Sequence, residues 1–136
     1  MRKLLPILFC LLLASCREKD AVQPPEFPSG TISLIIEGKS VFVYDDISCQ
    51  CSFDTSGNIF RAHTDDMGDY FFLGARRYSQ PLKKGDSLTA NLEWAVGRSV
   101  PQERTNVSFT VDDIDEEGYV YLWSSGSRIA AVIRIF

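Results

Sequence analysis

The chain has 136 residues, of which 14 are basic, 18 are acidic and one is histidine. After Cys16 there are 12 basic and 18 acidic residues, so this part of the chain has a net charge of about −6. That charge argues against nucleic acid as a partner, because such binding depends on Lys and Arg that meet phosphates. It also argues against a polybasic contact with a membrane surface.

The first sixteen residues have the composition of an export signal. Arg2 and Lys3 are positively charged, residues 4–13 are mostly apolar, and the small residues Ala14 and Ser15 follow. This order is typical of a secretory signal peptide. The apolar stretch is too short for a membrane-spanning helix, which needs about 20 residues. We therefore predict a cleavable signal over residues 1–15.

The order Leu13-Ala14-Ser15-Cys16 resembles the lipobox of bacterial lipoproteins. The resemblance covers residues 1–16, and it implies that the Cys16 thiol is acylated and that the chain is cut just before it. Two or more acyl chains on one cysteine would attach the protein stably to a membrane. The alternative is an ordinary signal peptide that contains a cysteine. In its layout the chain also resembles small Bacteroidota lipoproteins of unknown function, a likeness that implies neither fold nor activity.

The segment after Cys16 has the composition of a tether. Residues 17–30 contain three of the six prolines and show no hydrophobic periodicity. Proline-rich segments are extended and semi-rigid. Position 17 is Arg rather than the Asp associated with inner-membrane retention, which favours the outer membrane and leaves the periplasmic face and the cell surface both open. We expect a lipidated cysteine and tether over 16–30 and one domain over 31–136.

The expected domain consists almost wholly of strand patterns. Apolar side chains alternate with polar ones in most of these stretches, and residues 70–75 are wholly apolar, which suits a central strand. The stretches are 31–36, 41–44, 48–53, 60–63, 70–75, 87–96, 106–111, 119–123 and 129–136. No window of 11 or more residues shows a helical stripe. The sequence therefore predicts an all-β domain of eight or nine short, mostly antiparallel strands, as a β-sandwich or, alternatively, a small β-barrel.

Two cysteines and the one histidine are the first candidates for chemistry. The alternation places Cys49 and Cys51 on the same strand face as Phe53, which we assign to the core, and places His63 on an outer face. We expect buried free thiols, which are common among cysteines. Two alternatives are a disulfide in a distorted segment, since residues i and i+2 of a strand lie at the limit of disulfide geometry, and a metal or redox site.

Acidic residues gather in two places. One group comprises Asp65, Asp66 and Asp69, and the other comprises Asp112, Asp113, Asp115, Glu116 and Glu117. Calcium prefers several oxygen ligands from a loop, but neither group has the spacing of an EF-hand. Aspartate is also common in turns, and we interpret both groups as solvated turns. We predict no metal and no cofactor.

Three aromatic residues form the candidate binding stripe. If Val120 and Leu122 face the core, then Tyr119, Tyr121 and Trp123 share the opposite face. Three large aromatic side chains on an exposed face are unusual, and such a stripe could bind sugar rings or a protein partner. The alternative is that the aromatic side chains are themselves buried.

No catalytic motif is present in the sequence. The chain has no Gly-x-Ser-x-Gly elbow, no His-Glu-x-x-His pair and no glycine-rich phosphate loop. We predict a protein that is not an enzyme but a lipid-anchored ligand- or glycan-binding module of the cell envelope. The alternative is a structural or accessory subunit of an envelope complex, with a protein as its partner.

Overall fold

The computed structural model describes residues 27, 30–54, 58–64, 68–76 and 81–135. These residues form nine strands: β1 (Thr31–Ile36), β2 (Lys39–Asp45), β3 (Cys49–Asp54), β4 (Ile59–Thr64), β5 (Tyr70–Arg76), β6 (Ser87–Ala95), β7 (Gln102–Ile114), β8 (Tyr119–Ser124) and β9 (Ile129–Arg134). The all-β class and the number of strands are confirmed. Within these ranges the structure has no helix that could span a membrane.

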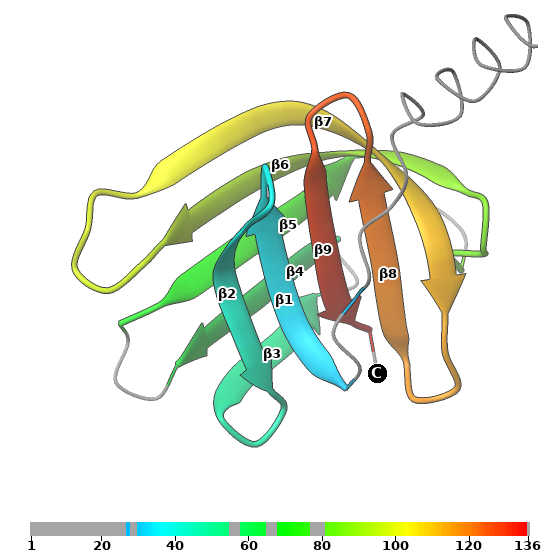
Figure 1. Ribbon diagram of the computed structural model, residues 1–136. Helices are drawn as coiled ribbons and strands as arrows, with labels where there is room; N and C mark the ends of the chain where they lie inside the picture. The colour runs from blue at the N-terminus through cyan, green and yellow to red at the C-terminus, as the bar shows by residue number, and fades with distance from the viewer. Residues whose placement is uncertain (1–26, 28–29, 55–57, 65–67, 77–80, 136) are drawn as a thin grey trace, which may run out of the picture.

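The nine strands belong to one continuous antiparallel sheet in the order β2-β1-β9-β8-β7-β6-β5-β4-β3. The sheet curls, so that β2, β1, β9 and β8 lie in front of β3, β4, β5 and β6 in Figure 1. The long strand β7 arches from the rear layer to the front one and makes the sheet continuous. Of the two predicted architectures, this nearly closed sheet corresponds to the barrel.

The sheet stays open between β2 and β3, which stand at the two ends of the strand order. All eight neighbouring pairs are antiparallel, and none of them joins β2 to β3. Only residues 46–48 connect these two strands. This short connection takes the chain from the front layer to the rear one, where β3 crosses behind β2 rather than running alongside it (Figure 1). The two edge strands therefore do not pair, and a seam remains between them.

The core fills the space between the two layers. Alternate side chains of the strands point inward, as period-2 geometry requires, and many of them are fully buried. The largest are Phe42, Phe60, Phe71, Phe109, Ile32, Leu34, Leu73, Leu122, Ile129 and Ile133. Phe42 of β2 lies 5.1 Å from Phe71 of β5 in an edge-to-face arrangement, ring centroid to ring centroid. Aromatic packing thus connects the front edge strand to the rear layer across the core.

Polar side chains also hold the seam together. Tyr44 of β2 donates a hydrogen bond to Asp69 Oδ2, and Asp69 Oδ1 accepts the N–H of Gly97 at 2.6 Å. On the other side, Arg134 of β9 forms an ion pair of 2.8 Å with Asp46 in the β2–β3 connection. These side-chain contacts connect the two layers at the seam, where β2 and β3 form no backbone hydrogen bonds with each other.

Strand β7 is longer than its predicted range of 106–111. It extends beyond that range at both ends, by residues 102–105 and 112–114. The four additional residues at its start are all exposed and lack an apolar pattern, so period-2 reasoning could not detect them. Asn106 adopts a positive φ of 55°, and its N–H donates to Asn91 Oδ1 at 3.0 Å. The β6–β7 register shifts at this point, between Ala90 and Leu92, as in a β-bulge.

The Tyr44–Asp69 contact can be tested with a double-mutant cycle. We predict that Tyr44→Phe lowers the free energy of unfolding by about 1–2 kcal/mol, because a hydroxyl bonded to a carboxylate is lost. Asp69→Ala should lower it by about 2–3 kcal/mol, because Gly97 also loses its acceptor. Denaturant unfolding of the double variant should show a loss about 1 kcal/mol smaller than the sum of the single losses. Strict additivity would show that the two side chains do not cooperate at the seam.

Candidate functional site

The predicted aromatic stripe lies on the outer face of β8. Val120 and Leu122 are fully buried in the core, so Tyr119, Tyr121 and Trp123 share the opposite face, as the alternation predicts. Tyr119 is nevertheless only 2% exposed, and the other two aromatic side chains are half-buried. The stripe therefore offers a ligand much less surface than three exposed rings would.

Contacts within the protein account for much of this burial. Phe27 packs edge-on against Tyr121, with ring centroids 5.3 Å apart, so one residue of the predicted tether lies on the domain. The Arg134 guanidinium lies 5.0 Å from the centre of the Tyr119 ring. The Tyr121 hydroxyl donates to Asp115 Oδ2 at 3.0 Å. Burial, together with this hydrogen bond, raises the pKa of Tyr121 to about 12.

The cysteines and the histidine lie on different faces of the sheet. Cys49 is buried and Cys51 is half-buried, and neither forms a disulfide within the described part of the chain. The β3–β4 register pairs Gln50 with His63 and Cys51 with Ala62, so His63 lies on the outer face, as predicted. Burial raises the pKa of the Cys51 thiol. The residues that the structure describes include no group of three or more His, Cys, Asp or Glu that could hold a metal ion.

The acidic groups supply acceptors for turns and for the seam. Asp115 Oδ1 accepts the N–H groups of Glu117 and Tyr119, each at 3.0 Å. Both carboxylate oxygens of Asp69 accept hydrogen bonds as well. These bonds agree with the interpretation of the groups as turns. Asp65 and Asp66, like Cys16, lie outside the described residues.

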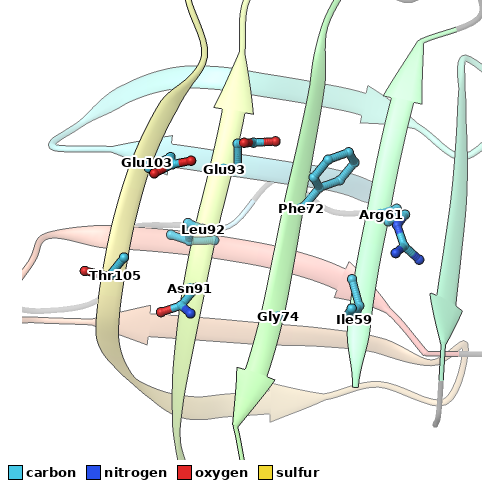
Figure 2. Close-up of a pocket in the computed structure, with 9 residues that line it drawn as sticks. All are labelled: Ile59, Arg61, Phe72, Gly74, Asn91, Leu92, Glu93, Glu103 and Thr105. Atoms are coloured by element: carbon cyan, nitrogen blue, oxygen red, sulfur yellow. The ribbon is translucent and has the colours of Figure 1, made fainter. Parts of the chain in front are cut away.

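A hollow of about 380 Å³ opens on the outer face of β4, β5, β6 and β7 (Figure 2). Its lining combines one aromatic ring, aliphatic and polar side chains, three charged groups and one glycine. The residues are Ile59, Arg61, Phe72, Gly74, Asn91, Leu92, Glu93, Glu103 and Thr105. Small-molecule sites are typically concave, with volumes of about 300–1,000 Å³, so the hollow has the size of a ligand site.

Strand register sorts the outward-facing residues of the hollow into two rows. In the first row, Arg61 pairs with Phe72, Phe72 with Glu93, and Glu93 with Glu103. Figure 2 shows these four side chains in line across the four strands. The Arg61 guanidinium lies 6.0 Å from the centre of the Phe72 ring. A cation therefore lies on one side of the ring and two carboxylates lie on the other.

The second row contains the glycine that makes the hollow. Gly74 pairs with Ile59 and with Asn91, and Thr105 follows on β7 (Figure 2). A Cβ atom placed on Gly74 would meet only Ile59 Cγ1 within 4 Å, at 4.0 Å, and the residue has no positive φ. Neither crowding nor backbone conformation requires glycine here. Glycine inside a strand costs about 0.5–1 kcal/mol relative to alanine, so its advantage at this position is the open floor.

The two carboxylates of the first row lie directly opposite each other. Like charges in this arrangement destabilise a sheet. The Tyr70 hydroxyl donates a long hydrogen bond of 3.4 Å to Glu93 Oε2, and burial together with the Glu93 charge raises the pKa of Tyr70. Among the described residues the only ion pair joins Arg134 to Asp46. No described cation therefore neutralises Glu93 and Glu103.

Sequence reasoning did not identify this hollow. The stretch 70–75 reads as wholly apolar, but Tyr70, Phe72 and Gly74 lie on the outer face, where all three are half-buried. Gly74 was the available signal, because a glycine inside a strand often marks a close approach of a ligand or of another backbone.

The Tyr121–Asp115 bond predicts a specific sensitivity to alkali. The pKa of Tyr121 is raised from about 10 in the unfolded chain to about 12 in the folded chain. Its contribution to stability is therefore complete below pH 10 and is lost as the pH rises through 12. The free energy of unfolding, measured with denaturant, should fall between pH 9 and pH 12 in both proteins. The fall should be about 1–2 kcal/mol smaller in the Tyr121→Phe variant than in the unchanged chain. Trp123→Phe, which removes no titrating group, should leave the pH dependence unchanged, and an equally steep loss in Tyr121→Phe would contradict the assignment.

No protein-family model matches the chain, and no significant match was found among curated proteins or solved structures. The function therefore has to be inferred from the chemistry and geometry of the chain itself.

Proposed function

We propose that this chain is a lipid-anchored protein of the cell envelope that binds a glycan, without catalysis, in the hollow over Gly74. The observation that carries the proposal is Gly74 itself. It keeps the floor of the hollow open at a cost in strand stability, although the local structure has room for a Cβ atom at this position. Proteins commonly accept such a cost at functional sites.

The lining of the hollow suits a sugar. Phe72 provides an apolar ring against which the C–H face of a sugar can pack, in the way that aromatic side chains anchor ligands. Asn91 and Thr105 lie in the second row, on β6 and β7, and Arg61 lies next to Phe72 on β4 (Figure 2). These groups supply the hydrogen-bond donors and acceptors that orient a ligand in an otherwise apolar site.

The arrangement of the carboxylates favours binding over hydrolysis. Glycosidases place two carboxyl groups on either side of the scissile bond. Glu93 and Glu103 instead lie next to each other at one end of the row, on β6 and β7. A sugar that packs on Phe72 would therefore have both carboxylates on the same side.

The proposed anchor and the hollow fit together spatially. Phe27 packs on the outer face of β8, in the front layer of Figure 1, whereas the hollow opens on the rear layer. Figure 2 shows the same relation from the other side, with β8 and β9 crossing behind the strands of the hollow. If Cys16 is lipidated, as its lipobox context implies, the eleven residue-to-residue steps from Cys16 to Phe27 span about 40 Å at most. This arrangement lets the hollow face away from the anchored side.

The proposal predicts that filling the hollow separates stability from binding. Gly74→Val should leave the free energy of unfolding unchanged or raise it by about 0.5–1 kcal/mol, because valine suits a strand and has room. It should also weaken glycan binding at least tenfold, because the side chain occupies the floor. Glycan-array screening would identify a ligand, and calorimetric titration would measure both variants. Gly126→Val, in the exposed β8–β9 turn, is the matched control and should bind normally.

Two results would contradict the proposal in different ways. If Gly74→Val binds normally while Trp123→Ala does not, the binding surface is the aromatic stripe of β8. If the unchanged chain binds no glycan and instead co-purifies from membranes with a protein, the chain is an accessory subunit of an envelope complex.

A further inference from the structure

We infer that the ligand of the hollow is an amino sugar, whose protonated amine binds between Glu93 and Glu103. The inference rests on the proposed function for its glycan part and adds the chemical class of the sugar. It depends on the two carboxylates at one end of the row, whose negative charge a neutral glycan would leave uncompensated.

The negative charge at this end of the hollow has no cation beside it in the described structure. Glu93 and Glu103 are register partners on the same outer face. Arg61 lies two strands away from Glu93, with Phe72 between them, a separation of about 9–10 Å by strand spacing. Arg104 follows Glu103 in sequence but points to the opposite face, where its guanidinium lies 5.5 Å from the centre of the Trp94 ring.

An ammonium group complements this pair in charge and in hydrogen bonding. Directly opposed carboxylates repel each other, and a cation between them removes that repulsion. An ammonium group has three donors and no acceptor, and carboxylates are acceptors only. Charge-assisted hydrogen bonds of this kind are stronger than neutral ones. The bound amine would therefore offset the repulsion between the two carboxylates.

The position of Phe72 selects a ring that carries the amine close by. Phe72 and Glu93 are neighbours across the β5–β6 ladder, so their backbones are about one strand spacing, 4.8 Å, apart. A single sugar unit can place its apolar face on Phe72 and its amine at the carboxylates. Arg61 on the far side of the ring repels a second cation, which orients the amine toward β6 and β7.

The test compares two oligosaccharides that differ only at the amine. The full chain is titrated with a β-1,4-linked glucosamine tetramer and with the N-acetylglucosamine tetramer of the same length, in low salt and at a pH where the amine is protonated. We expect the glucosamine tetramer to bind at least tenfold more tightly. The preference should shrink as salt is added, since screening weakens exposed charge pairs.

Three variants assign the preference to the carboxylate pair. Glu93→Gln and Glu103→Gln should each reduce the preference for the glucosamine tetramer to less than threefold. Glu116→Gln, in the exposed turn before β8, changes the net charge equally and should keep the full preference. A preference that falls equally in all three variants would reflect the overall charge of the chain and would overturn the inference.

The remaining outcomes separate this inference from the proposed function. Equal binding of both tetramers, abolished by Gly74→Val, would overturn the amino-sugar assignment and leave glycan binding intact. No binding of either tetramer or of any arrayed glycan would overturn both. A lysine tripeptide that binds as tightly as the glucosamine tetramer, with no loss in Phe72→Ala, would identify a peptide amine as the ligand and overturn the amino-sugar assignment.

Discussion

An antiparallel sheet closes into a complete ring only when its number of strands is even, and this sheet has nine. The two ends of the strand order, β2 and β3, are joined by only three residues, which carry the chain from one layer to the other. The sheet therefore has a seam, which the aromatic core, the Tyr44–Asp69 hydrogen bond and the Arg134–Asp46 ion pair hold together. Asp69, which belongs to one of the two acidic groups in the sequence, thus contributes to the fold at the seam.

The hollow lies on strands that are away from the seam. Strands β4 to β7 are each paired on both sides, so their outer face is a firm platform on which register, rather than a flexible loop, sets the spacing of side chains. Sites on strands hold their side chains more precisely than sites on loops. The platform also contains two features that lower stability, a glycine within β5 and two opposed carboxylates on β6 and β7. Both features follow naturally if a ligand fills the gap and neutralises the charge.

The sequence predicted the face of most side chains but not which strands are neighbours. Alternation correctly placed Cys49 and His63, because facing depends only on period-2 geometry within a strand. The row of the hollow depends on register between strands, and Glu93 and Glu103 meet only because β6 and β7 form a hairpin with a bulge near Asn106. The polar start of β7 carries no apolar pattern, so neither the hairpin length nor the opposed carboxylates could be predicted.

The central claim is that the outer face of β4 to β7 is the binding surface. Amide chemical shifts of the ¹⁵N-labelled chain, followed during titration with the glucosamine tetramer, test this claim most directly. The account predicts that the largest changes occur at Phe72, Gly74 and Asn91, with the amides of β8 nearly unchanged. Changes concentrated at Tyr121 and Trp123, with the amide of Gly74 unaffected, would contradict it.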